Sequence, residues 1–506
     1  MKPLRLSELA RMAGGRLHGE DRVVDAIATD TRAMPAAGAP LFLALAGERF
    51  DGHDHVAAAA RAGAVAALVA RPVDAPVPQV VVADTERALA AFAAALQRAR
   101  AGKVIAITGS NGKTSVKTLL LEILGRAGSA YANPGNRNNE IGLPLSVIDA
   151  PDDADFAIYE MGAGKPGDIA YLTGIARPDV ALVNNIAPAH LERMGSLLGV
   201  ADTKAAIYDA LAQGGVAAVN ADDAFAPWFV QRLLAHGTPA RRVIRFGIEA
   251  SADVRATEIA ATREGMRFRL VTPAGEAPVA LALAGRHNVG NALAAAALAL
   301  GAGVGLDHVV AGLEAARGVA GRLARHALAG GAVLLDDSYN ANPGSLGAAI
   351  DTLAAGQGPA WLVLGDMREL GVDGAALHAD AGRRAKAAGI ARVYALGGLS
   401  AHAADAFGEG ARTFESHAAL AQALRADLDA AVAASAGAPA GATVGATSVA
   451  SPSGQAQKQL ATHVAPTDGG EGEDAGVPTI LVKGSRGSAM DRIVHALLQG
   501  EAADAA

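Results

Sequence analysis

The amino-acid sequence predicts an α/β protein in three domains. Short apolar runs typical of buried strands alternate with helical stretches along most of the chain, and polar clusters follow the strands as they do in open parallel sheets. A length of 506 residues fits about three domains of ordinary size. A strand–turn–helix pattern at residues 103–120, KVIAITGSNGKTSVKTLL, is the segment around which the other elements can be ordered.

Composition and charge exclude several classes of protein. Hydrophobic residues make up 51% of the chain and aromatic residues 4%, so the core is built mainly from Ala, Val and Leu, and the chain is too apolar to be disordered. The formal net charge is −7 with no basic stripe, so we expect no nucleic-acid partner. The absence of cysteine excludes disulfides, thiolate nucleophiles and cysteine-ligated zinc.

No segment has the pattern of a signal peptide or a membrane span. Residues 1–15 predict an amphipathic helix capped by Ser7, with no apolar signal core after it. The longest uncharged apolar run, residues 292–306, is shorter than the roughly 18 residues of a spanning helix and is typical of a buried helix with its C-cap. We therefore expect a soluble, cytoplasmic protein.

The first segment, residues 1–98, alternates strands and helices. Expected strands are 23–28, 41–45, 64–70 and 80–83, and expected helices are 7–13, 55–62 and 85–101, the last capped by Asp84. Polar clusters at residues 30–32 and 47–54 lie at strand ends. From the residues alone, solvated loops are the favoured interpretation of both clusters.

Residues 103–120 predict a phosphate-binding loop. Small residues between Gly109 and Gly112 let backbone N–H groups crowd around a phosphate, and the following helix N-terminus adds about half a positive charge. Lys113 supplies a point charge for the β- and γ-phosphates, and the Thr114 hydroxyl is the expected Mg²⁺ ligand. The motif is the shorter T-G-x-x-G-K-T, because Ile107 stands where the common P-loop has a further glycine.

Other candidate groups of the central segment, residues 99–320, follow its strands. Glu160 ends the expected strand 156–160, where α/β sheets place Mg²⁺ ligands. His190 lies past the strand 180–184 and is as consistent with a structural histidine as with a metal ligand. Lys204 opens an expected helix and has the pattern of a surface lysine.

The rest of the central segment leaves one pair of residues undecided. Four asparagines within residues 133–139 expose amide groups that a substrate could use. Short alternating runs at 243–247, 266–271 and 279–283 predict an antiparallel excursion. Asn288 and Asn291 fit either a helix cap or contacts to an adenine edge.

The third segment, residues 321–506, predicts a second open parallel sheet with its own site edge. Its expected strands, each followed by a polar cluster, are 333–335, 361–364, 393–396 and 479–482. Residues 436–477 interrupt the pattern with Ala, Gly, Ser, Thr and Pro and no apolar periodicity, which predicts a disordered insertion.

Taken together, the motifs resemble the Mur ligases of peptidoglycan synthesis. In chain order they are TGSNGKTS, NPGNRNNEIGLPLS, EMGAGKPGDI, AHLERMGSLLGVADTKAAI, GRHNVGN, DDSYNANP, GDMREL and KGSRG. The N-x-N-N-E-I-G, D-D-S-Y-N-A-N-P and G-D-M-x-E-L elements are similar to those of the members that add D-alanyl-D-alanine. The resemblance implies a small N-terminal α/β domain for the UDP-sugar (1–98), a central P-loop-type ATPase domain (99–320) and a C-terminal Rossmann-like domain (321–506).

The resemblance also implies a role for each candidate residue around ATP. The residues implied to hold the ATP phosphates are Thr108, Gly109, Ser110, Asn111, Gly112, Lys113, Thr114 and Ser115. Those implied to bind metal are Thr114, Glu160, His190 and Lys204, the last by a lysine carbamate that several relatives carry. Asn288 and Asn291 match adenine contacts, Arg322 matches the arginine that reaches the γ-phosphate, and Asp337, Tyr339 and Asn340 match contacts to the ribose and phosphates. The implied catalytic set is Lys113, Glu160, His190, Lys204 and Arg322.

Substrate residues follow from the same resemblance. Those implied to cradle the UDP end are Asp30, Thr31, Arg32, Gly47, Arg49, Asp51 and His53, while Asn138 and Asn139 would face the muramoyl peptide. The implied activity is an ATP- and Mg²⁺-dependent ligase, with two metal ions, that joins D-alanyl-D-alanine to UDP-N-acetylmuramoyl-tripeptide through an acyl phosphate. We expect a monomer.

Three alternatives stay open on the sequence. One is another amide ligase of the superfamily, either a diaminopimelate- or lysine-adding enzyme or a folylpolyglutamate synthase. A silent nucleotide-binding homologue would be expected to lack one of Lys113, Glu160, His190 and Arg322, which are all present. A GTPase-like switch would need guanine-reading elements, and none is found.

Overall fold

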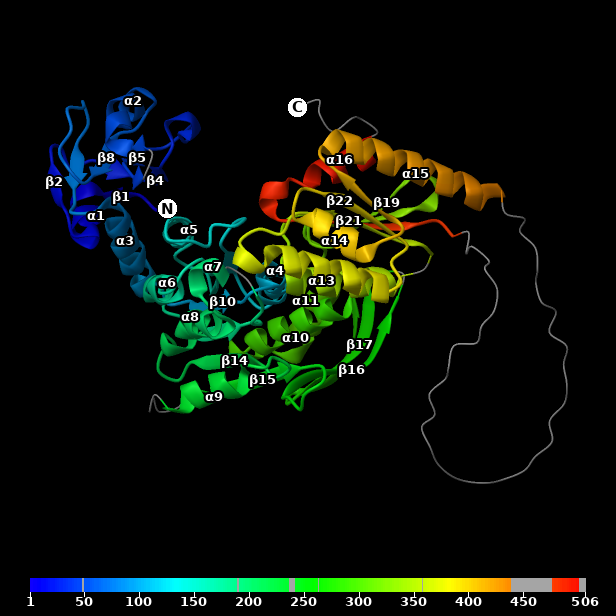
Figure 1. The fold of residues 1–506 in the computed structure, drawn as a ribbon. Coiled ribbons are helices and arrows are strands. Elements are labelled where there is room, and N and C mark those ends of the chain that lie inside the picture. Colours follow the sequence, from blue (N-terminus) through cyan, green and yellow to red (C-terminus); the bar gives the residue numbers. More distant parts are fainter. Residues whose placement is uncertain are drawn as a thin grey trace.

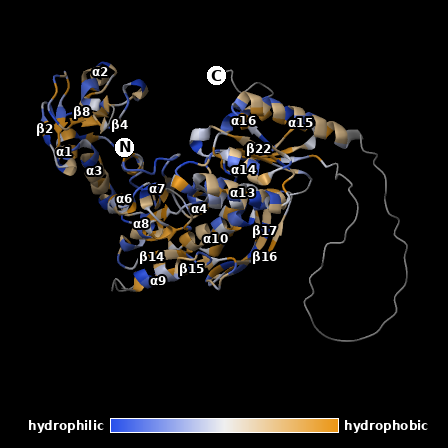
Figure 2. Ribbon diagram, viewed as in Figure 1, coloured by the Kyte–Doolittle hydropathy of each residue, from blue (hydrophilic) through white to orange (hydrophobic). Residues whose placement is uncertain are grey.

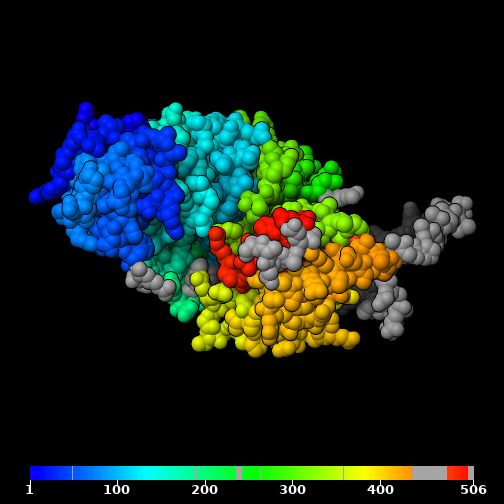
Figure 3. All heavy atoms as spheres, turned by 90° about the horizontal axis from the view of Figure 1, so that it is seen from above, coloured from blue at the N-terminus to red at the C-terminus, as the bar shows by residue number. Residues whose placement is uncertain are grey.

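The structure is a computed structural model that describes residues 1–47, 50–188, 191–235, 242–262, 264–356, 358–437 and 476–499. The N-terminal domain lies at one end of the molecule, joined through α3 to the central domain, and the third domain packs on the far side of the central domain (Figures 1 and 3). Apolar residues concentrate inside each domain (Figure 2). No described helix is long and apolar enough to cross a membrane.

The N-terminal domain is built on a mostly parallel sheet in the order β2-β9-β8-β5-β4. Its strands are β2 Arg16–His18, β4 Ala26–Ala28, β5 Pro40–Leu43, β8 Ala66–Val69 and β9 Gln79–Val81, with two small pairs, β1 Leu4–Arg5 with β3 Val23–Val24 and β6 Ala46–Gly47 with β7 Phe50–Asp51. Its helices are α1 Leu6–Ala13, α2 Val56–Arg61 and α3 Thr85–Ala99, with 3₁₀ turns η1 Thr31–Ala33 and η2 Gly52–His55. The expected strand 23–28 is therefore two strands, because β3 pairs with β1 and β4 pairs with β5.

One predicted helix cap is confirmed and one is wrong. Asp84 accepts a hydrogen bond from the Arg87 amide (2.9 Å) at the start of α3, as predicted. Ser7 instead lies in the first turn of α1, and its amide and hydroxyl donate to the Asp21 carboxylate at 2.9 and 2.8 Å. A carboxylate distant in sequence takes over the capping role here, which local pattern could not predict.

The central domain is a sheet in the order β11-β12-β10-β13-β14-β15-β16-β17-β18. Its strands are β10 Lys103–Thr108, β11 Ala130–Ala132, β12 Phe156–Glu160, β13 Val180–Val183, β14 Val216–Asn220, β15 Arg242–Gly247, β16 Val254–Ala261, β17 Met266–Thr272 and β18 Gly275–Leu281. Its helices are α4 Lys113–Leu124, α5 Gly142–Asp149, α6 Asp168–Ala176, α7 Leu191–Met194, α8 Leu197–Asp209, α9 Ala226–Ala235, α10 Arg286–Gly301 and α11 Leu306–Ala315. Among the described strands of this sheet, β17 is antiparallel to its neighbours β16 and β18, and every other neighbouring pair is parallel. β15, which we expected in the antiparallel excursion, runs parallel to β14 and β16.

Helices cover both faces of the central sheet. Alternate residues of β10 point to opposite faces: Val104 and Ala106 pack in the core with α5, α6 and α8, and Ile105 and Ile107 pack in the core with α4, α10 and α11. This two-sided burial explains why the parallel strands are continuous apolar runs. The run 292–306 forms the buried part of α10 and the loop after it, as predicted.

The third domain has a sheet in the order β19-β20-β24-β21-β22-β23, parallel except for β19. Its strands are β19 Ala324–Ala327, β20 Val333–Asp337, β21 Ala360–Gly365, β22 Arg392–Leu396, β23 Ala411–Phe414 and β24 Thr479–Lys483. Its helices are α12 Pro343–Ala354, α13 Gly374–Ala387, α14 Ser400–Phe407, α15 His417–Gly437 and α16 Asp491–Gln499, with turns η3 Ala329–Gly331, η4 Gly371–Asp373 and η5 Arg486–Ser488. Although β24 is last in the sequence, it lies between β20 and β21, and so it brings the KGSRG segment to the middle of the site edge. Of the predicted insertion, residues 438–475 lie outside the described residues.

Candidate active site

The turn between β10 and α4 has the shape of a phosphate cradle. Gly109 and Gly112 have φ angles of 151° and 77°, which favour glycine. A Cβ at Gly109 would lie 2.9 Å from the Asn184 Cβ, and one at Gly112 would collide with the Asn291 side-chain oxygen. No side chain caps the first N–H groups of α4, so they stay available to an anion.

Lys113 begins α4 and is folded back over this turn. Its Nζ donates to the Gly109 carbonyl at 2.8 Å. Burial lowers the pKa of Lys113, and the nearby Arg322 guanidinium adds to the lowering while Glu160 opposes it. The loop therefore holds a poorly solvated ammonium next to the position where the cradle would take a phosphate.

Glu160 ends β12 next to the cradle and is only 3% exposed. Its Oε2 accepts from the Thr114 hydroxyl (3.0 Å) and lies 3.2 Å from Lys117 Nζ, and its Oε1 accepts from the Asn138 amide (2.9 Å). Burial alone would raise the pKa of Glu160, but Lys117, Lys113 and the Asn138 hydrogen bond outweigh it and hold the pKa below its usual value. The carboxylate is thus kept ionised in a buried position.

The pair formed by Thr114 and Glu160 fits a Mg²⁺ ion. Two neighbouring oxygens of an octahedral Mg²⁺ site with bonds of about 2.1 Å lie about 3 Å apart, and the Thr114 Oγ1 to Glu160 Oε2 distance is 3.0 Å. The described residues contain no group of three or more His, Asp or Glu that could hold a metal by itself. A site with one carboxylate, one hydroxyl and the phosphates of a nucleotide matches the usual way in which Mg²⁺ is bound.

Lys204 is buried rather than on the surface, and it lies in the middle of α8 rather than at its start. It is 2% exposed. Burial lowers the pKa of Lys204 to about 7, repulsion from Lys113 acts in the same direction, and Asp168 opposes both. The sequence prediction was wrong because α8 is buried on most sides, so apolar periodicity does not reveal which of its positions face solvent. A buried amine with this pKa has the neutral form that carbamylation requires.

A cavity between the central and third domains gathers most of the predicted nucleotide residues. Those that line it are Ser110, Asn111, Gly112, Lys113, Thr114, Ser115, Asn288, Asn291, Arg322, Asp337 and Asn340. Thr108, Gly109 and Tyr339 are not part of the lining; the Thr108 hydroxyl donates to the Met161 carbonyl (3.0 Å) inside the sheet. The two domains touch across the cavity, where Asn342 Nδ2 donates to Asn111 Oδ1 at 2.7 Å.

Asn288 and Asn291 form a linked pair on the wall of this cavity. Helix α10 begins at Arg286 with Gly285 as its N-cap, so the capping interpretation of Asn288 is wrong. Asn288 donates to the Ala284 carbonyl (2.8 Å) and accepts from Asn291 (3.0 Å). These bonds fix both amides at the cavity wall, and their contact to adenine stays a prediction.

Comparison with known proteins decides the family. Three family models match: the catalytic domain of the Mur ligase family over residues 23–97, the Mur ligase middle domain over 107–299 and the Mur ligase glutamate ligase domain over 321–447. The UDP-N-acetylmuramoyl-tripeptide–D-alanyl-D-alanine ligase of Escherichia coli K12 is 40% identical over 498 residues, which cover 98% of this chain and 99% of that protein. The chain belongs to the Mur ligase family.

Solved structures agree with the sequence relatives. A crystal structure of MurF from Acinetobacter baumannii has a TM-score of 0.85 and 32% identity, with 99% of both chains covered. A MurF ligase from Thermotoga maritima in complex with ADP shares the fold, with a TM-score of 0.75 and 23% identity over 94% of this chain and 97% of that chain. The predicted three-domain Mur ligase architecture is confirmed, and the chain is a ligase.

The residues predicted to cradle the UDP end lie in the N-terminal domain, outside the cavity. Asp30 caps η1 and pairs with Arg32 at 2.7 Å. Asp51 caps η2, contacts His53 Nδ1 at 2.6 Å and pairs with Arg71 at 2.9 Å, and these bonds hold its pKa well below the usual range. His53 is buried and accepts from the Ala70 amide (2.7 Å), so the described part of the second cluster, residues 50–54, is an ordered turn rather than a solvated loop.

The two asparagines predicted to face the muramoyl peptide lie in the loop beside Glu160. Asn138 donates to Glu160, and its carbonyl accepts from the Gly162 amide (2.8 Å). The Asn139 side-chain oxygen accepts a hydrogen bond from the Gly142 amide (2.8 Å) at the start of α5. Asn138 is therefore coupled to the Glu160 carboxylate, while Asn139 shapes the loop.

Several residues at this site were not predicted, and four of them carry polar or charged contacts that matter most. Lys117 holds Glu160, Asn342 joins the domains, and His287 and Lys483 line the cavity. Lys483 is buried and bonds Asp337 (2.5 Å) and the Asn340 carbonyl (3.0 Å). Their signals were available: a lysine within an apolar helix, an asparagine before the first proline of a helix, and polar residues inside the quoted motifs.

Two predicted site residues, Arg49 and His190, lie outside the described residues. Their roles, like the roles of the other site residues, remain predictions.

Proposed function

We propose that this chain, a Mur ligase of the D-alanyl-D-alanine-adding kind, activates the terminal carboxylate of UDP-N-acetylmuramoyl-tripeptide as an acyl phosphate. The amine of D-alanyl-D-alanine then attacks the activated carbonyl and expels phosphate, which gives UDP-N-acetylmuramoyl-pentapeptide for peptidoglycan synthesis. Activation is needed because a free carboxylate would have to expel oxide to acylate an amine. ATP supplies the phosphoryl group.

The observation that carries this proposal is the grouping of cations and oxygen ligands around one cavity. Lys113 and Arg322 line it together with Thr114, next to which Glu160 is held ionised. Phosphoryl transfer and acyl transfer both gather negative charge in a small volume, so the main task of the protein is positioning and electrostatic stabilisation. Lys113 and Arg322 would stabilise that charge together.

We assign Thr114 and Glu160 to one Mg²⁺ ion, and Lys204, as a carbamate, together with His190 to a second. When bound, such ions would neutralise the negative charge that develops during transfer. The chain's part is to keep Glu160 ionised through Lys117 and Asn138 and to keep Thr114 within 3.0 Å of it.

The third domain completes the cavity and would exclude water from the acyl phosphate. Asp337, Asn340 and Lys483 form its wall, and the Asn342–Asn111 hydrogen bond draws α12 against the phosphate loop. We propose that this contact forms on closure before chemistry, because a reactive acyl phosphate needs a dry site. We also propose that the protein is a monomer, which light scattering would test. We propose that it works in the cytoplasm, which cell fractionation would test.

The test is phosphate release from ATP and Mg²⁺ with UDP-N-acetylmuramoyl-tripeptide, with and without D-alanyl-D-alanine. We expect release that requires both peptides, and a pentapeptide product by mass spectrometry. Lys113→Ala and Glu160→Ala should abolish the signal, while Lys103→Ala, at the exposed opposite end of β10, should not. Release that responds to a free amino acid instead of the dipeptide would contradict the proposed acceptor.

A further inference from the structure

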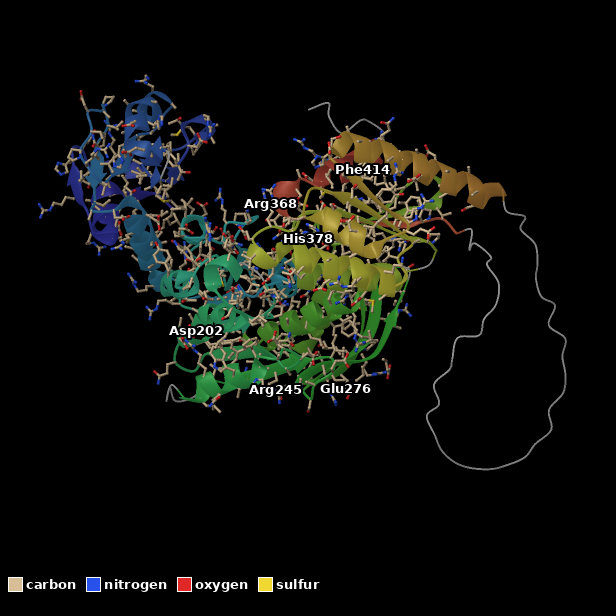
Figure 4. The ribbon with its side chains drawn as sticks, in the orientation of Figure 1. Asp202, Arg245, Glu276, Arg368, His378 and Phe414 are labelled. Atoms are coloured by element: carbon tan, nitrogen blue, oxygen red, sulfur yellow. The ribbon has the colours of Figure 1, made fainter. Side chains whose placement is uncertain are left out.

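Two arginines lie together on the third domain, at the carboxyl edge of its sheet. Arg368 follows β21, and Arg486 follows β24, the neighbouring strand. Figure 4 shows Arg368 beside η5, on the side of the third domain that faces the N-terminal domain. Neither arginine was assigned a role above.

The loops that carry these arginines are interlocked by hydrogen bonds. The Arg368 amide donates to Ser485 Oγ (2.9 Å), and the Asp366 carbonyl accepts from the Ser485 amide (3.0 Å) and from Ser488 Oγ (2.9 Å). The Met367 amide donates to Nε2 of the buried His378 (2.9 Å). The backbone on which the two side chains stand is therefore fixed from several sides.

Each guanidinium is held in place without a carboxylate partner. Arg368 lies over the backbone of Gly487, where an added Cβ would be 3.0 Å from its Cζ. Arg486 lies over the ring of Tyr339 (5.3 Å to the centroid) and donates to its hydroxyl (3.1 Å), which uses one of its five N–H donors. Among the described residues, no acidic side chain forms an ion pair with either arginine.

Arg486 lies within the reach of a dipeptide from Arg322. Arg322 lies over the same Tyr339 ring at 4.1 Å, so the two guanidinium groups are at most about 9 Å apart. An extended dipeptide spans about 7 Å. If its amine attacks a carbonyl beside Arg322, its carboxylate therefore reaches Arg486.

We propose that Arg486 and Arg368 bind the terminal carboxylate of the incoming D-alanyl-D-alanine and so set which acceptor the ligase accepts. The inference rests on the proposed function above. Planar guanidinium groups bind carboxylates through paired N–H donors, and an ion pair between a ligand and a preorganised arginine favours an acidic terminus over a neutral one. In the proposed function the UDP-linked substrate would be held by the N-terminal domain and the loop of Asn138, which leaves this face for the dipeptide.

The experiment compares D-alanyl-D-alanine with D-alanyl-D-alaninamide, which has no terminal charge, in the phosphate-release assay. For the unaltered enzyme we expect KM to be 30- to 100-fold higher with the amide. Arg368→Gln and Arg486→Gln should each raise the KM for the dipeptide at least 10-fold and bring the acid and the amide closer together. KM for ATP and for UDP-N-acetylmuramoyl-tripeptide should stay within 2-fold.

Two further variants sharpen the test. Gly487→Ala leaves both arginines in the sequence but displaces Arg368, so it should raise the dipeptide KM by less than Arg368→Gln does. Arg383→Gln is the control: it removes an exposed arginine whose one ion pair among the described residues is with Asp380, and it should leave the dipeptide KM unchanged.

The proposal would be overturned if the arginine variants left the dipeptide KM unchanged, or if they raised the KM for the acid and for the amide by the same factor. A rise in KM confined to the tripeptide substrate would also overturn it. Failure of the proposed function would look different, because the unaltered enzyme would then release no dipeptide-dependent phosphate.

Discussion

Replacement of Lys117 by Met should destabilise the protein by leaving Glu160 without its cation. The ammonium is 6% exposed and donates to the Asn133 carbonyl (2.9 Å) and the Gly135 carbonyl (3.0 Å), besides its contact with Glu160. Breaking a buried ion pair by removing one partner costs about 3–5 kcal/mol. Glu160 keeps its bonds from Thr114 and Asn138, so we expect a loss near the lower end, about 3 kcal/mol.

Urea unfolding of the unaltered protein and of Lys117→Met, Glu160→Gln and the double variant would measure this loss. The double variant leaves no unpaired charge, so its loss should be smaller than the sum of the two single losses by about 2 kcal/mol. Mg²⁺ with ADP should stabilise Lys117→Met more than the unaltered protein, because a cation bound at Glu160 replaces the missing charge. Lys103→Met, at an exposed position, is the control.

Two results would refute this reasoning. If Lys117→Met lost less than about 0.5 kcal/mol, the ion pair would not be the contact that holds Glu160. If the single losses simply added in the double variant, the two side chains would act independently.

Three other predictions concern the same cavity. Burial lowers the pKa of Lys204 to about 7, so ¹³C-bicarbonate should give a carbamate NMR signal that grows from pH 6 to pH 8. The Lys204→Arg variant should give no such signal. A protein with Lys204 that gives no carbamate signal at pH 8 would contradict the assignment. Gly112→Ala places a methyl group against Asn291 and should weaken ADP binding at least 10-fold by calorimetry, whereas Gly63→Ala, which also has a positive φ but meets open space, should not. Burial lowers the pKa of His287 to about 4, against about 6.5 in the unfolded chain, so the folded state binds fewer protons between these two pH values. The free energy of unfolding should therefore rise with pH across this window by about 3 kcal/mol in total. In His287→Gln, the plot of unfolding free energy against pH should be flatter.

Local chemistry explains why the nucleotide loop could be predicted. The glycines, Lys113 and Thr114 act through the turn and helix that they themselves form, and Glu160 follows from the rule that parallel strands end at one edge. These features depend on residues close in sequence or on a general property of the fold. They could therefore be predicted from the sequence without knowledge of the tertiary packing.

Features that depend on distant residues could not be predicted in this way. The burial of Lys204 follows from the packing of α8 against α6 and the central sheet, and its partner Asp168 belongs to α6. Ser7 looked like a cap until Asp21 supplied the acceptor. The parallel direction of β15 depends on its pairing with β14, because short alternating runs look alike in either direction.

Each side of the cavity has a buried carboxylate that is paired with a buried lysine. Beside the central wall, next to the lining residue Thr114, Glu160 pairs with Lys117, and on the third-domain wall Asp337 pairs with Lys483. Both lysines are buried and also donate to backbone carbonyls: Lys117 to two carbonyls in the loop after β11, and Lys483 to the Asn340 carbonyl in the loop after β20. Each ammonium therefore fixes both a carboxylate and a loop. An unpaired carboxylate on either wall would repel the phosphates of a nucleotide, whereas a paired one can still act as an acceptor or a metal ligand. The buried lysines thus allow acidic groups to stand beside a polyanion, which is the condition under which a cavity can hold metal and phosphate together.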